Sequence, residues 1–148
     1  MNEQEKRAFV KRIAEGFVPF NKWLALELTE FDPVKLRVEN RQELVGNAVH
    51  NFLHGGIIAS VLDVAGGIAI FQNLLSASEI GTPEEAAERF GRVGTVDIRI
   101  DYLRPGTGKE FIATGEIIRQ GNRISVTRME LHNDQGQLVA LGTGTYVC

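Results

Sequence analysis

A long apolar helix that contains a single acidic side chain constrains this sequence more than any other feature. The segment that begins at Leu53 reads LHGGIIASVLDVAGGIAIFQNLL, and Asp63 is the only ionisable residue between Gly56 and Phe71. Burying a carboxylate costs several kcal/mol unless the group is hydrogen-bonded or neutral. We therefore expect Asp63 either to be satisfied by structural hydrogen bonds or to take part in chemistry.

The same segment offers a backbone site for negative charge. Gly55 lies in a His-Gly-Gly step that opens the predicted helix, eight residues before Asp63. Free N–H groups at the start of a helix stabilise developing negative charge. An oxyanion site and a buried acid on one short segment suggest acyl chemistry.

Helix geometry separates these two groups within one chain. Eight residues correspond to a rise of about 12 Å and a rotation of about 80°. A general base must lie roughly 3 Å from the proton that it takes, or act through one water. Gly55 and Asp63 can therefore act on one ester only if they come from different subunits, which predicts a dimer. Asp63 would serve either as general base for water or as a nucleophile that forms a transient anhydride.

Composition limits the classes of protein to consider. The 148 residues suit one domain, and 43% apolar with 24% charged residues is ordinary for a globular protein. The net charge of −3 argues against nucleic-acid binding, which needs a concentrated basic face. The single cysteine, Cys148, excludes an intrachain disulfide framework and is expected to be a bystander.

The sequence favours a cytoplasmic protein without membrane contact. The first residues, MNEQEKRAFVKR, lack the apolar core of a signal peptide. The stretch Ile57–Leu75 approaches membrane-spanning length, but it contains Asp63 and the Gly66-Gly67 pair and has no basic flanks. It is therefore predicted to be a core helix.

The pattern along the chain predicts an α+β fold. Glu3–Glu15 is expected to form a surface helix, Phe17–Trp23 an irregular segment, and Thr82-Pro83 the start of a short helix. Strand-like runs, the first two joined by the turn signal Asp32-Pro33, are Leu24–Phe31, Val34–Glu39, Arg92–Leu103, Glu110–Gln120, Arg123–Asn133 and Gln137–Val147. The separators of the last four runs are hairpin signals, namely Arg104-Pro-Gly-Thr-Gly, Gly121-Asn122 and Asp134-Gln135-Gly136. With no second long helix available, the apolar helix must lie on the concave face of the sheet.

Other polar residues near the helix have two interpretations each. His54 can donate to a substrate carbonyl or bond the backbone at the helix entry. Asn47 can contact substrate or simply serve the turn in which it lies, and Thr95 can support Asp63 or be an ordinary strand residue. His50 and His54 have a spacing of four, but both precede the helix, so no metal site is expected.

Three of these segments together resemble a known family. Gly46-Asn47, the run Leu53-His54-Gly55-Gly56 followed by Asp63, and the later strand VGTVDIRIDYLRP are similar to the hot-dog fold thioesterases of the phenylacetyl-CoA thioesterase type. The resemblance extends from about Leu24 to Val147. It divides the chain into an N-terminal helical segment, 1–22, and a thioesterase domain, 23–148.

The resemblance implies a fold, an assembly and roles. The fold would be a long central helix wrapped by a curved antiparallel sheet, in a homodimer or homotetramer with active sites between protomers. One chain would supply Asp63 as catalytic carboxylate and Thr95 to hold water. The other would supply the Gly55 N–H to polarise the thioester carbonyl, with Asn47 and His54 in support.

The function expected on this basis is hydrolysis of an acyl-CoA thioester to a free acid and coenzyme A. No metal or redox cofactor is implied, and coenzyme A enters only as part of the substrate. The residues expected to contact the substrate are Gly56, Ile57, Val61 and Ile68 for the acyl group, and Arg92, Arg119, Arg123 and Arg128 as candidates for the phosphates.

Two other functions remain open at this point. A hydratase or dehydratase on the same fold is less favoured, because such lyases pair an acid with a nearby histidine and none follows Asp63 before His132. A module that binds acyl-CoA without cleaving it would not need a buried carboxylate. Asp63 therefore discriminates between the enzyme and the binding module.

Overall fold

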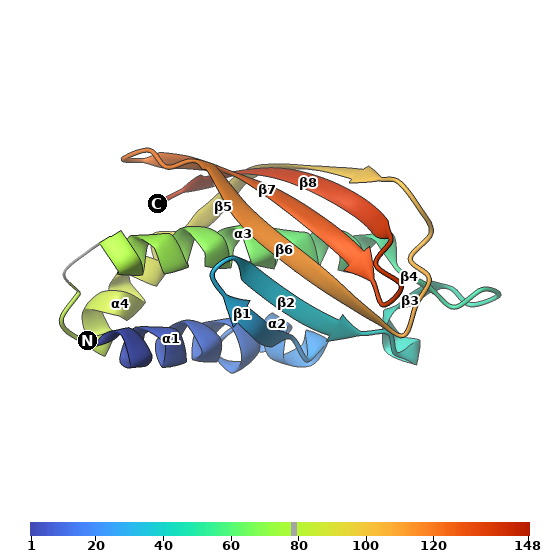
Figure 1. The fold of residues 1–148 in the computed structure, drawn as a ribbon, viewed down its shortest axis with the longest axis horizontal. Helices are drawn as coiled ribbons and strands as arrows, with labels where there is room; N and C mark the ends of the chain where they lie inside the picture. The colour runs from blue at the N-terminus through green and yellow to red at the C-terminus, as the bar shows by residue number, and fades with distance from the viewer. Residues whose placement is uncertain (78–79) are drawn as a thin grey trace.

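The central helix α3 (Gly55–Ala77) crosses the molecule beneath a curved antiparallel sheet, and α1 (Glu3–Arg12) runs along its other side (Figure 1). The computed structural model describes residues 1–77 and 80–148. A short helix, α4 (Pro83–Phe90), lies near the C-terminal end of α3. These layers agree with the predicted α+β hot-dog architecture, including the start of the long helix at Gly55.

The sheet has six strands in the order β1-β2-β6-β7-β8-β5, all antiparallel. Their bounds are β1 (Glu27–Phe31), β2 (Val34–Glu39), β5 (Gly94–Tyr102), β6 (Glu110–Arg119), β7 (Ile124–Asn133) and β8 (Leu138–Val147). A separate two-stranded hairpin, β3 (Val45–Asn47) and β4 (Phe52–Leu53), projects from one end of the molecule (Figure 1). It follows a 3-10 turn at Gln42–Leu44.

One predicted hairpin is wrong. The separator between β5 and β6 contains turn residues, yet β5 pairs with β8 at the sheet edge. The connection is held by other backbone bonds: Leu53 N–H donates to Gly106 O at 2.9 Å, and Leu103 N–H donates to Val139 O at 2.9 Å. It therefore runs across the end of the sheet instead of closing a tight turn.

The N-terminal region is more regular than expected. The helix that begins at Glu3 continues through a π-helical turn at Ile13–Phe17, and the segment predicted to be irregular forms most of α2 (Pro19–Leu24). Pro19 suits the first turn of α2 because the first N–H groups of a helix lack intrahelical partners. Consequently β1 begins only at Glu27. The expected division between residues 22 and 23 falls inside α2.

The core forms between α3 and the sheet, where the backbones of the helix and of β6 lie close together. A Cβ at Gly115 on β6 would lie 2.3 Å from the Ala65 carbonyl oxygen, so only glycine lets this strand contact the helix backbone. On the opposite side Phe9 packs against Phe71, with ring centroids 6.0 Å apart. By length and composition α3 could span a membrane, but 50% of that window is buried within this fold.

Candidate active site

Asp63 is held by two hydroxyl groups that come from the sheet. Thr95 Oγ1 donates to Asp63 Oδ1 at 2.8 Å, and the Tyr146 hydroxyl donates to the same oxygen at 3.0 Å. Within residues 1–77 and 80–148 no hydrogen bond reaches Asp63 Oδ2. One carboxylate oxygen is therefore anchored, and the other is left to act on water or substrate.

The strand register explains why these two hydroxyls meet at one atom. Thr95 on β5 lies directly opposite Tyr146 on β8, so their side chains share the face that covers α3. Next to this pair the register shifts, because Val96 is an extra residue between Thr95 and Asp97. Such bulges change the direction of a strand and are frequent beside active sites.

Tyr146 was not identified from the sequence. It is 1% exposed, and burial raises the pKa of its hydroxyl, with the negative charge of Asp63 raising that pKa further. The hydroxyl therefore stays protonated and able to donate. A Cβ at Gly66 would lie 2.4 Å from the Tyr146 oxygen, so this glycine makes room for the ring. A tyrosine near the end of a strand gives no signal of this role until the register places it opposite Thr95.

A cavity of about 290 Å³ opens beside the carboxylate. Its walls come from the start of α2, from α3, from the segment between the end of α4 and β5, and from β8. The lining residues are Val18, Asn21, Asp63, Val64, Gly67, Ile68, Phe90, Val93, Gly94, Thr95 and Tyr146. The lining is mostly apolar, with polar groups concentrated around Asp63. Ligand sites commonly combine an apolar wall with a few placed polar groups.

Asn21 is an unusual member of this lining. Its residue is 3% exposed, yet among the described residues no hydrogen bond involves its side-chain amide. The amide atoms are not sealed from solvent, because among the described residues only Asn40 Oδ1 is a buried side-chain polar atom without a hydrogen-bond partner. Because Asn21 lines the cavity beside Asp63, its amide is available to a bound ligand or water.

The helix start forms a second group of candidate residues. Gly56 N–H donates to His54 Nδ1 at 2.8 Å, which leaves the proton of the neutral imidazole on Nε2. The His54 side chain therefore bonds the backbone at the helix entry, which is one of the two roles expected for it. The Gly55 N–H has no acceptor within residues 1–77 and 80–148, and the Tyr102 hydroxyl donates to the Gly55 carbonyl at 2.7 Å.

Asn47 serves the turn of the β3–β4 hairpin. Its Oδ1 accepts the Val49 N–H at 3.1 Å and the His50 N–H at 3.3 Å. The neighbouring Gly46 packs so closely on His54 that an added Cβ would lie 2.8 Å from the His54 Cα. The hairpin thus lies beside the helix start.

The structure brings the predicted residues together as two separate groups. Asp63 and Thr95 line the cavity described above, whereas Gly55 lines another of about 460 Å³ together with Phe52 and Tyr102. The two cavities share no lining residue. Within one chain the free Gly55 N–H and the free Asp63 oxygen therefore face different spaces.

Most of the residues expected to bind substrate do not line the cavity at Asp63. Ile68 lines the cavity at Asp63, but Ile57 does not, and Val61 is 0% exposed within the core of the chain. Arg92 pairs with Glu88 on the surface. The other candidates are exposed on β6, on β7 and in the turn between these strands, namely Arg119, Arg128 and Arg123.

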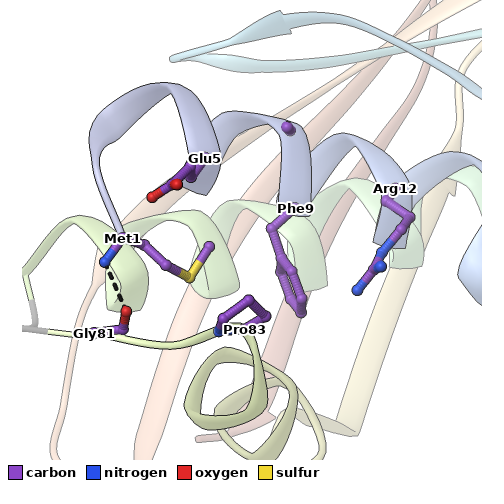
Figure 2. A pocket seen from close by; sticks show the side chains of 7 residues that line it. Met1, Glu5, Phe9, Arg12, Gly81 and Pro83 are labelled. Carbon is purple, nitrogen blue, oxygen red and sulfur yellow. Dashed lines mark hydrogen bonds between the residues drawn. The ribbon is translucent and has the colours of Figure 1, made fainter.

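Another cavity lies away from this chemistry. It measures about 360 Å³ between α1 and the start of α4, where the Met1 ammonium donates to Gly81 O at 2.9 Å (Figure 2). Phe9 and Pro83 supply apolar walls (Figure 2). None of its lining residues belongs to either group of site residues. In the described part of the chain no cluster of three or more His, Cys, Asp or Glu side chains could hold a metal.

Known proteins identify the family. Residues 50–140 match the family model of the thioesterase superfamily. The chain is 41% identical to the medium/long-chain acyl-CoA thioesterase YigI of Escherichia coli, over 93% of this chain and 92% of the relative.

Solved structures agree with this match. A Shewanella oneidensis protein related to the thioesterase superfamily shares 44% identity with a TM-score of 0.89, covering 97% of this chain and 95% of that one. A mutant of the phenylacetic acid degradation protein PaaI of Thermus thermophilus shares 25% identity with a TM-score of 0.66, covering 87% and 97%. The family model matches more than half of the sequence, and solved structures of the family share the fold of this chain. The chain therefore belongs to the thioesterase superfamily.

Proposed function

We propose that this protein hydrolyses medium- to long-chain acyl-CoA thioesters to a free acid and coenzyme A. The observation that carries the proposal is the Asp63 carboxylate, with Oδ1 fixed by Thr95 and Tyr146 and Oδ2 free beside an apolar cavity. The similarity to YigI, named for this activity, supports the substrate class.

The reaction needs a base, an oxyanion site and a leaving thiolate. Asp63 Oδ2 takes a proton from a water, whose oxygen attacks the thioester carbon. The carbonyl oxygen becomes negative and is stabilised by the Gly55 N–H, as backbone donors do in acyl transfer. The C–S bond then breaks, and coenzyme A leaves as a thiolate that receives the proton from Asp63. These steps use the chain's own groups and require neither metal nor redox cofactor.

The oxyanion donor would come from the partner subunit's Gly55. This assignment is supported by the helix spacing and by the two separate cavities. β5 is an edge strand of the sheet, and it carries exposed apolar side chains at Val96 (61%) and Tyr102 (53%). Unprotected edges of this kind favour pairing with another strand. Two copies joined at β5 would form one continuous sheet, and the assembly would be a homodimer or a pair of dimers in the cytoplasm.

The test measures release of free coenzyme A thiol from acyl-CoA esters of increasing chain length. Wild type should release thiol, and Asp63→Asn and Asp63→Ala should lower turnover by about 10²–10⁴-fold, the usual loss when a general base is removed. Glu116→Gln is the matched control, because Glu116 is an exposed carboxylate on β6 that lines neither cavity and lies away from the β5 edge. It should keep wild-type turnover.

Each alternative outcome has a meaning. Binding of acyl-CoA without thiol release would support the binding module, and addition of water to an unsaturated acyl group would support a hydratase. Loss of folding in both Asp63 variants, seen by circular dichroism, would mean that Asp63 is structural. In single turnover in ¹⁸O water, label on the Asp63 carboxylate would overturn its role as base in favour of a nucleophile.

A further inference from the structure

The two adjacent glycines of α3 have different environments. Gly66 is required by contact, since its Cβ would lie 2.4 Å from the Tyr146 hydroxyl and 2.8 Å from Thr127 Oγ1. At Gly67 the nearest atom to an added Cβ is Tyr146 Cε1 at 3.8 Å, an ordinary van der Waals distance. Glycine inside a helix costs about 0.5–1 kcal/mol relative to alanine. Packing within the chain therefore explains Gly66 and leaves Gly67 unexplained.

The space left by Gly67 is part of the cavity at the carboxylate. Gly67 lies four residues after Asp63, so both positions are on the same face of α3, about 6 Å apart along the helix. Both line the 290 Å³ cavity. A side chain at position 67 would project into this cavity one turn beyond the reacting group.

The walls beyond Gly67 are apolar. Ile68 follows on α3, and Phe90 and Val93 close the side formed by the end of α4 and the start of β5. The α2 segment contributes Val18. Of the polar members, Thr95 and Tyr146 bond Asp63 itself, and the third, Asn21, comes from α2. On the side of α3, α4 and the start of β5, the lining beyond Gly67 is apolar, which matches an acyl chain extending from a thioester carbon.

We propose that Gly67 determines the acyl length that this enzyme accepts, by keeping open the channel through which the chain passes beyond Asp63. This inference rests on the proposed thioesterase function. Because Gly67 has no side chain, it leaves room for the acyl chain, although glycine makes the helix less stable than alanine would. A larger residue would block the chain beyond its first carbons while leaving Asp63 and its two hydroxyl partners in place.

The experiment compares Gly67→Ala and Gly67→Leu with wild type on saturated acyl-CoA esters from butyryl to palmitoyl. Gly67→Leu should lower kcat/KM for the long esters relative to butyryl-CoA by at least about 10-fold, since a misfit of even one methylene in an apolar pocket changes rates by about 10–200-fold. Gly67→Ala should shift the profile in the same direction by less. Its thermal midpoint should equal or exceed that of wild type, because alanine favours the helix.

Gly16→Leu is the matched control. It adds the same side chain to a helical glycine whose Cβ would meet nothing within 4 Å, and Gly16 does not line the cavity. Its chain-length profile should be that of wild type. Should Gly67→Leu fail to fold, Gly67→Ala supplies the test, because its Cβ makes only an ordinary contact.

Two results would overturn the inference. An unchanged chain-length profile in folded Gly67 variants would show that the acyl chain does not pass this residue. An equal fall for every ester would assign the cavity to the coenzyme A portion. Wild type that releases no thiol from any ester would instead overturn the proposed function. In that case affinities of wild type and Gly67→Leu for butyrate and palmitate still decide whether position 67 selects by length, since only palmitate binding should be lost.

Discussion

Tyr146 gives Asp63 a fixed orientation that no neighbour on α3 provides. Its hydroxyl and that of Thr95 converge on one carboxylate oxygen from two paired strands. Hydrogen bonds to a charged acceptor are worth about 1.5–3 kcal/mol each. Both hydroxyls are protonated at neutral pH, so the carboxylate stays anchored while its other oxygen is free for the proposed reaction.

Replacing Tyr146 with phenylalanine should reveal this positioning role. Tyr146→Phe removes one donor to Asp63 and should lower kcat by about 10–100-fold with little change in KM, as expected for one lost charge-assisted hydrogen bond. Thr95→Val should have a similar effect. Steady-state kinetics supply the measurement, and a rise in KM with kcat unchanged would contradict the role.

Tyr146→Phe should also change how the stability of the fold depends on pH. The pKa of Tyr146 is raised in the folded protein, whereas an unfolded tyrosine titrates near about 10. Above about pH 10 the unfolded chain loses this proton and the folded chain keeps it, so stability falls by up to about 1.4 kcal/mol per pH unit. Chemical denaturation between pH 8 and 11 should show a steeper decline for wild type than for Tyr146→Phe, and equal slopes would refute the assignment.

Asn21 and Asn133 form a contrasting pair of asparagines at buried positions. Asn21→Leu should not lower the free energy of unfolding, because its amide has no protein partner among the described residues, but it should lower kcat/KM. Asn133 bonds Thr107 O at 3.0 Å and the Gln137 N–H at 2.9 Å. Asn133→Leu should therefore destabilise the fold by several kcal/mol. Equal destabilisation of the two variants in urea denaturation would contradict the absence of a protein hydrogen-bond partner for the Asn21 amide among the described residues.

At the scale of elements, the position of the site depends on how closely α3 approaches the sheet. The β6 backbone touches the helix backbone at Gly115. On the other side of the site, the bulge at Val96 separates the part of β5 that carries Thr95 from the rest of the edge strand. The distance between helix and strands thus sets whether Thr95 and Tyr146 can reach Asp63.

Gly115→Ala tests this approach. Its Cβ would lie 2.3 Å from the Ala65 carbonyl oxygen, so helix and strand must separate, at a cost of about 1–3 kcal/mol typical of an overpacked core. Thermal denaturation should show a clear decrease in midpoint, with reduced turnover. Gly16→Ala, in open space, should leave the midpoint unchanged or higher. Equal midpoints for the two variants would mean that the stability of the fold does not depend on the close contact between β6 and α3 at Gly115.

At the scale of the whole molecule, each chain carries both halves of the proposed site, facing different cavities. A dimer would therefore contain two sites, each using Asp63 from one chain and the Gly55 N–H of the other. The exposed apolar residues of the β5 edge suit the contact that would join the copies.

Complementation between inactive variants tests this arrangement. Asp63→Asn removes the base, and Gly55→Pro removes the N–H at the first helical position, where proline is tolerated and an added Cβ would lie 3.4 Å from the Tyr102 ring. Each homodimer should be inactive. Mixed dimers should regain one intact site, and thus about half of the wild-type turnover per dimer. Thiol release from a purified mixed dimer with two affinity tags provides the measurement, and inactivity of the mixture would place both groups in one chain's site.

Local patterns in the sequence predicted the elements that depend on neighbours along the chain. The helix from Gly55, the strand at Val34–Glu39 and the capped start of α4 at Thr82 all agree with the structure. The residue Asp63 stood out because an isolated acid in an apolar helix is costly. The α2 helix was missed because Phe17–Trp23 is too short for a periodic signal.

The sequence by itself determined the helix, its acid and the glycine at its start, because those features depend on composition and spacing along one segment. Only the tertiary structure decided that β5 pairs with β8 rather than β6, and with it that Thr95 and Tyr146 meet at Asp63. Pairing between strands far apart in the chain is chosen by the packing of the whole sheet on α3. Short turns join β6 to β7 and β7 to β8, which do pair, whereas the turn residues after β5 report only where that strand ends.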